Sequence, residues 1–154
     1  MASGTYDATT GLPNMVDPTF PRIKARELRD VIKNAKRMQD YVIVDVRDED
    51  FEGGNIPGCI HLPSYTFDRD VDDLAQRVKK VKNVIFTCFY SQQRGPLAAR
   101  KFRDIRDATV EMEFEQNIYV LGGGMSRFIS YFGEDEKYIE NYDPEFWSGV
   151  KREG

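Results

Sequence analysis

Short apolar runs and amphipathic stripes alternate along the chain and predict an α/β domain. The apolar runs have strand length, and apolar residues at helical spacing lie between them. We expect strands at 20–24, 41–46, 59–62, 84–88 and 117–121, and helices around 28–38, 71–81, 98–105 and 125–132. Because strands and helices alternate, the pattern favours one domain with a central, mainly parallel five-stranded sheet flanked by helices on both faces.

The first 19 residues have a different character. They are rich in Gly, Thr, Asp, Asn and Pro and show no hydrophobic periodicity. We therefore interpret 1–19 as a flexible N-terminal arm and 20–154 as the folded domain. A chain of 154 residues with 40% hydrophobic residues is long enough to bury a core in one such domain.

Charge and composition limit the kinds of partner and the cellular compartment that we expect for this protein. The net charge of −4 argues against nucleic acid as a partner. No apolar run has membrane-spanning length, and the N-terminus lacks the apolar segment of a secretory signal, so we expect no membrane association. Cys59 and Cys88 are expected to be free thiols in a reducing compartment, the cytoplasm, with the nucleus as the alternative.

The candidate chemistry lies where the run 84–88 ends at Cys88. Five residues separate it from Arg94, and Gly95 and Pro96 then open a helix. At such a junction, loop N–H groups and the unpaired N–H groups of the helix start form an anion cradle, in which a thiol ionises more readily. The planar guanidinium of Arg94 matches two oxygens of phosphate or arsenate. We predict that Cys88 and Arg94 act as a pair.

Four carboxylates near the second strand receive structural interpretations. Asp45 interrupts an apolar run, so we expect it to be paired with Arg47 or with a backbone N–H group. Glu49, Asp50 and Glu52 follow that strand, and we interpret them as solvated loop carboxylates rather than as proton donors.

We also expect structural roles for the remaining residues that could take part in chemistry. Cys59 in a short apolar strand indicates an inert buried thiol rather than a second redox cysteine. His61 is the only histidine and is expected to pack or form a hydrogen bond, so no metal site is predicted. For Ser91 two interpretations stay open, a hydrogen bond to the Cys88 sulfur or a cap on its own backbone. The aromatic tail, which we expect to cover an edge of the core, contains Tyr138, Tyr142, Phe146 and Trp147.

Four ordered segments together resemble the landmarks of a rhodanese-like domain. They are 43–47, 53–63, the Cys88 loop and 119–128, and the resemblance extends from about 21 to 147. The span from Cys88 to Arg94, followed by Gly95 and Pro96, is longer than the loop of sulfurtransferases. It is similar to that of the M-phase inducer dual-specificity phosphatases and the yeast-type arsenate reductases.

This resemblance implies Cys88 as the nucleophile and Arg94 as the oxyanion clamp. It also implies that the backbone binds the substrate through Phe89, Tyr90, Ser91, Gln92, Gln93 and Arg94. The chain departs from the family pattern at four positions. Thr87 stands where the family has histidine, Asn55 replaces another histidine, Gln93 replaces a glutamate of the cell-cycle phosphatases, and Val46 replaces their second cysteine.

The leading function predicted is hydrolysis of phosphomonoesters of the protein tyrosine or dual-specificity type, through a thiophosphate on Cys88. The substrate would be a phosphorylated protein or a small oxyanion, and no cofactor is required. The first alternative is arsenate reduction, with electrons from glutathione and glutaredoxin. A phospho-ligand-binding module with little catalysis is a further alternative, and sulfur transfer is the least favoured because the loop is too long for it.

Overall fold

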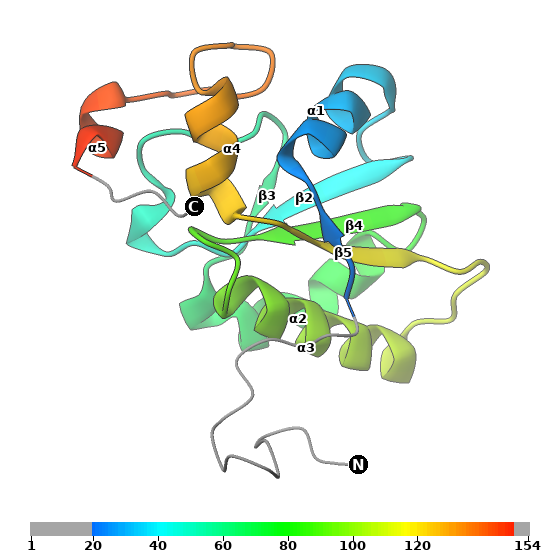
Figure 1. The fold of residues 1–154 in the computed structure, drawn as a ribbon. Helices are drawn as coiled ribbons and strands as arrows, with labels where there is room; N and C mark the ends of the chain where they lie inside the picture. The colour runs from blue at the N-terminus through cyan, green and yellow to red at the C-terminus, as the bar shows by residue number, and fades with distance from the viewer. Residues whose placement is uncertain (1–19, 150–154) are drawn as a thin grey trace, which may run out of the picture.

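A computed structural model describes residues 20–149, and its centre is a sheet of five parallel strands. The strands are β1 (Arg22–Ile23), β2 (Tyr41–Asp45), β3 (Ile60–His61), β4 (Asn83–Thr87) and β5 (Asn117–Leu121). Their order is β1-β5-β4-β2-β3, so β4 is central (Figure 1). The predicted parallel sheet is confirmed, whereas the predicted arm at 1–19 lies outside the described residues.

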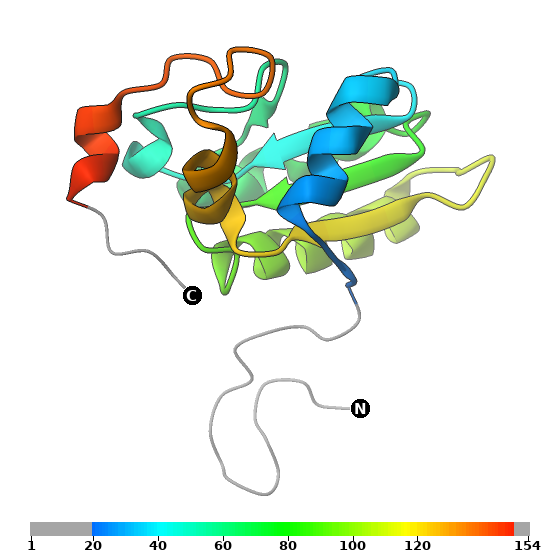
Figure 2. The same cartoon turned by 45° about the horizontal axis from the view of Figure 1, so that its top comes forward.

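Helices cover both faces of this sheet, as the alternating pattern predicts. The helices are α1 (Ala25–Asn34), α2 (Phe67–Arg77), α3 (Arg94–Thr109), α4 (Gly124–Phe132) and α5 (Pro144–Ser148), with two 3-10 turns, η1 (Glu49–Phe51) and η2 (Ser64–Thr66). In Figure 1, α2 and α3 lie on one face, and α1 and α4 lie on the other. Figure 2 shows α5 beyond α4, beside the segment that follows β2.

The core has two halves, one on each face of the sheet. Val44 and Phe86 belong to the half that packs against α2 and α3, whereas Ile43 and Ile85 belong to the half that packs against α1 and α4. Successive residues of a strand point to opposite faces, so a strand covered on both faces has a continuous apolar run. This geometry explains why β2 and β4 lack the alternation of a half-exposed strand.

Two helices end earlier than their apolar stripes. The first stripe extends to residue 38, but α1 ends at Asn34 because the backbone of Ala35 is extended, with φ −110° and ψ 166°. Met38 then adopts a left-handed φ of 68° and donates its N–H to the Tyr41 carbonyl at 2.7 Å. The second stripe extends to 81, but α2 ends at Arg77. Val78 and Val81 remain buried in the turn that follows α2. The apolar pattern therefore predicted which residues are buried more accurately than it predicted where the helix ends.

The aromatic tail contains α5, which the pattern did not predict. Asp143 caps the helix by accepting the Glu145 N–H at 3.0 Å, and Pro144 occupies its first turn. Trp147 is buried and donates its indole N–H to the Gly53 carbonyl at 2.9 Å. The expectation that this tail covers an edge of the core is confirmed.

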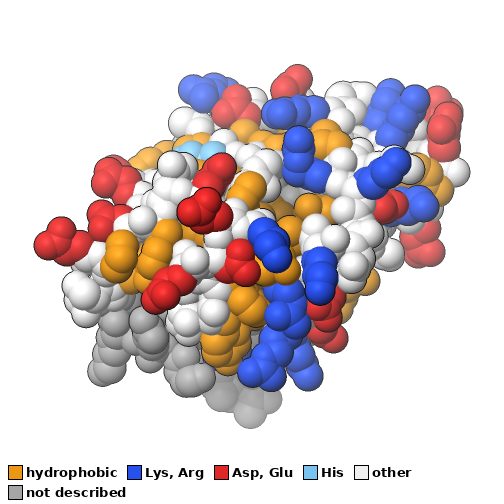
Figure 3. Space-filling model, turned by 90° about the horizontal axis from the view of Figure 1, so that it is seen from above, with side chains coloured by type: hydrophobic (Ala, Val, Ile, Leu, Met, Phe, Trp, Pro, Cys, Tyr) orange, Lys and Arg blue, Asp and Glu red, His pale blue; other side chains and the backbone are white. Residues whose placement is uncertain are grey.

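The surface of the described residues is polar and unevenly charged. Within residues 20–149, no helix is both long and apolar enough to cross a membrane. Figure 3 shows Lys and Arg side chains gathered in a band on one face, with most acidic side chains to either side of it.

Candidate active site

Cys88 follows β4 directly, at the carboxyl edge of the central strand. Its side chain is buried, with 3% of its surface exposed. Two backbone N–H groups point at the sulfur, that of Ser91 at 3.2 Å and that of Gly95 at 3.3 Å. Gly95 lies in the first turn of α3, where N–H groups have no partner within the helix. The sulfur therefore lies in a nest of N–H donors that favours a negative charge.

The loop is held in shape by Ser91 and Thr87. Ser91 has a positive φ of 59°, which turns its N–H toward the sulfur. Its hydroxyl accepts the Cys88 N–H at 3.3 Å and lies 3.4 Å from the hydroxyl of Thr87, which is itself fully buried. The structure thus agrees with the second interpretation of Ser91, in which its hydroxyl caps the loop backbone. The group of Ser91 that faces the sulfur is its backbone N–H, not its hydroxyl. Thr87, the last residue of β4, thus supports the loop through its contact with the Ser91 hydroxyl.

The start of α4 packs directly against the loop backbone. Met125 and Ser126 donate their N–H groups to the carbonyls of Cys88 and Phe89, each at 2.9 Å. A Cβ atom on Gly124 would lie 2.5 Å from the Phe89 carbonyl oxygen. Only glycine allows this approach, which also requires a positive φ of 63°. Gly124, the first residue of α4, therefore belongs to the site, a role that its place in the sequence did not indicate.

The other loop residues take different positions. Phe89 stacks on Trp147 with ring centroids 5.2 Å apart, so α5 supports the loop from the side. Tyr90 is partly exposed, and Gln92 and Gln93 are exposed at the end of the loop. Within the predicted loop, the Ser91 N–H group points at the Cys88 sulfur, whereas the side chains of 89–93 lie in different surroundings.

Arg94 begins α3 and forms ion pairs with two aspartates of the segment after β2. Its guanidinium contacts both oxygens of Asp50, at 3.0 and 2.6 Å, and one oxygen of Asp48 at 3.2 Å. The hydrogen bonds that Arg94 donates to Asp50 raise the pKa of Arg94 above its usual value. Partial burial raises the pKa of Asp50, but the hydrogen bonds and charge of Arg94 outweigh burial and hold that pKa below its usual value. Both groups are therefore charged at neutral pH.

The interpretation of Asp50 as a solvated carboxylate is wrong. The sequence pattern indicated no role for Asp48, whose side chain is only 8% exposed and accepts the Ser64 hydroxyl at 2.5 Å. The sheet topology explains why Asp48 and Asp50 both reach Arg94, because β2 and β4 are parallel neighbours and their carboxyl ends meet at one edge of the sheet. The sequence signal for this contact is a set of acidic residues directly after one buried strand together with an arginine after the neighbouring strand.

Asp45 and Arg47 form a buried ion pair at the end of β2. The shortest contact is 2.7 Å, and the two side chains are 1% and 0% exposed. Arg47 also donates to the carbonyls of Asp50 at 3.2 Å and Gly54 at 3.0 Å. The predicted partner of Asp45 is confirmed, and Arg47 links the end of β2 to the turn behind it.

The second cysteine and the histidine have structural surroundings. Burial, followed by the charge of Asp45, raises the pKa of Cys59 to about 12. Asn55 contacts this sulfur at 3.7 Å and donates to Glu140 at 2.9 Å, so it connects two loops. The ring of His61 stacks on Phe51 with centroids 3.8 Å apart. These contacts agree with an unreactive Cys59 and a packed His61.

Comparison with known proteins agrees with this fold. The family model of the rhodanese-like domain matches residues 25–131. The dual specificity phosphatase ibp1 of Schizosaccharomyces pombe is 38% identical over 115 residues, which are 66% of this chain and 83% of the relative. Arsenical-resistance protein 2 of Saccharomyces cerevisiae is 32% identical over 110 residues, 65% of this chain and 82% of the relative.

Solved structures with a similar fold include proteins of the same kinds. A yeast protein described as a protein tyrosine phosphatase of the rhodanese family has a TM-score of 0.71 at 28% identity, covering 83% of this chain and 96% of its own. The As-Sb reductase from Leishmania major has a TM-score of 0.67 at 26% identity, covering 76% and 81%. With the family model matching most of the described residues, the chain belongs to the rhodanese-like domain family.

Proposed function

We propose that this protein is a cysteine-dependent phosphatase that hydrolyses phosphomonoesters of the protein tyrosine or dual-specificity type. The observation that carries the proposal is the pair of N–H groups, from Ser91 and Gly95, that point at the Cys88 sulfur. Two of the similar proteins named above are described as a dual specificity phosphatase and a protein tyrosine phosphatase, which supports the same assignment.

The N–H groups of this nest favour a thiolate on Cys88 and an anionic substrate beside it, which is the arrangement that the reaction needs. The Cys88 thiolate attacks phosphorus, a sulfur–phosphorus bond forms, and the bond from phosphorus to the leaving oxygen breaks. The loop N–H groups and Arg94 stabilise the charge on the other phosphoryl oxygens. Water then attacks the thiophosphate, releases inorganic phosphate and restores the thiolate.

The resting position of Arg94 adds a step before the attack. Its guanidinium is bound to Asp48 and Asp50 and is 32% exposed, so an incoming phosphate competes with two carboxylates for it. Because Asp50 is ionised at neutral pH, it accepts hydrogen bonds and has no proton for the leaving group. We therefore expect faster turnover of aryl phosphates, whose leaving groups need little protonation, than of alkyl phosphates.

Arsenate reduction is the second candidate, because two of the similar proteins are an arsenical-resistance protein and an As-Sb reductase. Here the thiolate would displace hydroxide from arsenate. A glutathione thiolate would then attack the Cys88 sulfur, forming a Cys88–glutathione disulfide, while the sulfur–arsenic bond breaks and its electron pair reduces arsenic to arsenite. Glutaredoxin would reduce this mixed disulfide and restore the Cys88 thiolate. Cys59 is a poor second thiol for this step because its pKa of about 12 keeps it protonated.

A side-by-side assay tests both candidates on the full chain. We expect aryl-phosphate hydrolysis by the wild type, loss of turnover in Cys88→Ser, and wild-type turnover in the matched variant Cys59→Ser. Glutaredoxin-coupled arsenate consumption without aryl-phosphate turnover would select the second candidate. Phosphate binding with neither reaction would instead indicate a phospho-ligand-binding module.

A further inference from the structure

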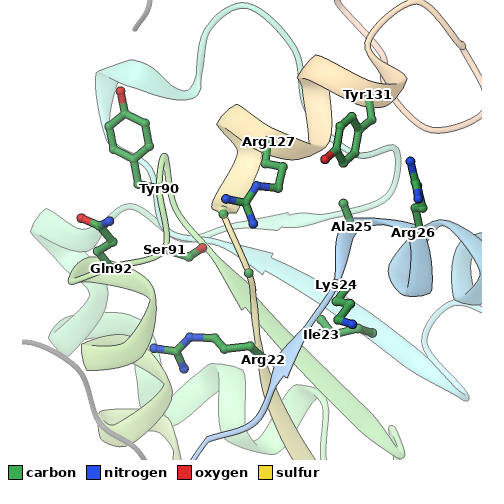
Figure 4. Close-up of a pocket in the computed structure, with 12 residues that line it drawn as sticks. Arg22, Ile23, Lys24, Ala25, Arg26, Tyr90, Ser91, Gln92, Arg127 and Tyr131 are labelled. Atoms are coloured by element: carbon green, nitrogen blue, oxygen red, sulfur yellow. The ribbon is translucent and has the colours of Figure 1, made fainter. Parts of the chain in front are cut away.

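A basic groove opens beside the Cys88 loop, outside the nest that holds the sulfur. It has a volume of about 700 Å³ and is lined by β1, the start of α1, the start of α4 and the loop (Figure 4). Four of its twelve lining residues are basic, namely Arg22, Lys24, Arg26 and Arg127, and none is acidic. This composition is unexpected in a chain with a net charge of −4.

The groove is continuous with the candidate active site through Ser91. This residue lines the groove, and its N–H group points at the Cys88 sulfur at 3.2 Å. Figure 4 shows the Arg127 side chain directed from α4 toward the space between β1 and the loop, with Ser91 across that space. A phosphate bound in the nest would therefore have the groove directly beside it.

Three of the four groove cations lack an ion-pair partner among the described residues. Among residues 20–149, no carboxylate forms an ion pair with Lys24, Arg26 or Arg127. Arg26 instead lies over the ring of Tyr131, 5.6 Å from its centroid, which holds it at the outer end of the groove. A groove in which Lys24, Arg26 and Arg127 form no ion pair attracts anions and disfavours cationic ligands.

From this arrangement we propose that the preferred substrate is a phosphorylated peptide segment with a second anionic side chain, which binds in the basic groove. A peptide fits better than a small bisphosphate because Ile23, Tyr90 and Tyr131 lie among the cations and offer apolar surface between two charges. This inference rests on the proposed phosphatase activity. It makes Lys24, Arg26 and Arg127 specificity-determining residues.

The test compares matched phosphotyrosine peptides, one with glutamates beside the phosphotyrosine and one with glutamines. We expect the wild type to favour the acidic peptide in kcat/KM by roughly tenfold at low salt, the size expected for two or three exposed ion pairs. The triple variant Lys24→Gln, Arg26→Gln, Arg127→Gln should bring this ratio close to one. Higher salt should reduce the wild-type ratio, because the cations are exposed.

The matched control removes three positive charges at the opposite end of the strands. Lys79, Lys80 and Lys82 are exposed in the turn that leads into β4, and their triple replacement by glutamine should keep the wild-type ratio. A wild-type ratio near one, or a ratio that the groove variant leaves unchanged, would overturn the inference.

A binding measurement separates this inference from the proposed function. Fluorescence anisotropy of the same peptides with Cys88→Ser reports on the groove without turnover. If the wild type hydrolyses neither peptides nor aryl phosphate, the phosphatase proposal fails, while a preference of Cys88→Ser for the acidic peptide still supports the groove. Tighter binding of an inositol bisphosphate than of the acidic peptide would overturn the peptide assignment.

Discussion

Two arginines, Arg47 and Arg94, each bind an aspartate at the carboxyl edge of the sheet, yet their surroundings differ. Arg47 is 0% exposed, and its remaining N–H groups donate to backbone carbonyls as well as to Asp45. Arg94 is 32% exposed, and its partners Asp48 and Asp50 lie on a neighbouring segment. The first pair is enclosed, whereas the second faces solvent beside the nucleophile.

This difference shows that burial, rather than the ion pair itself, separates a structural arginine from one available to a ligand. Releasing Arg47 would leave a charge in the core without a partner, so the pair stays closed. Releasing Arg94 exposes its charge to water or to an oxyanion at little cost. Each pair also has a cysteine nearby, and only Cys88, near Arg94, has backbone N–H groups directed at its sulfur.

The largest effect is expected from breaking the enclosed pair. Arg47→Met leaves Asp45 buried and unpaired, which should lower the free energy of unfolding by about 3–5 kcal/mol. Urea denaturation of the full chain measures this loss. The double variant with Asp45→Asn should recover part of the loss because the unpaired charge is removed. A single variant as stable as the wild type would contradict the structural role of Arg47.

Arg94→Lys should affect activity more than stability. Lysine keeps the positive charge but loses the planar fork, so we expect kcat/KM for an aryl phosphate to fall by about 10²–10³-fold. The free energy of unfolding should change by less than about 1 kcal/mol, because the ion pair is partly exposed. If the unfolding energy fell strongly while turnover persisted, Arg94 would resemble Arg47 and the comparison would fail.

The smallest effect is expected from Asp50→Asn, which weakens the competitor of the substrate phosphate for Arg94. The KM for an aryl phosphate should fall a few-fold, with a smaller change in kcat. Glu52→Gln, which removes an exposed carboxylate from the same segment, is the control and should leave KM unchanged. A higher KM in Asp50→Asn would show that Asp50 positions Arg94 for the substrate instead of competing with it.

The same variant should change the stability at acid pH. The pKa of Asp50 is lower in the folded than in the unfolded protein, so the folded state binds fewer protons. The stabilisation is fully present above the usual aspartate pKa of about 3.9 and is lost as pH falls through the lower folded value. Melting temperatures at mildly acidic and strongly acidic pH should therefore differ less in Asp50→Asn than in the wild type.

Local patterns in the sequence were enough to predict most of the fold. Continuous apolar runs predicted β2 and β4, since a strand buried on both faces has no polar side. The helix limits were less accurate, because apolar spacing continues where the chain turns, as at Met38 and Val81. The helix α5 was missed because its stability depends on Trp147 packing against Gly53 and Phe89, residues distant in the chain.

The sequence by itself determined the five parallel strands, the order of strands and helices, and the placement of Cys88 and Arg94 around one loop. These features depend on local spacing and hydrophobic periodicity. Only the tertiary structure decided that Asp48 and Asp50 hold Arg94, that Gly124 packs against the loop, and that β1 and α4 form a basic groove beside it. Those contacts join segments that are far apart in the chain, and only the packing of the sheet and its helices brings them together.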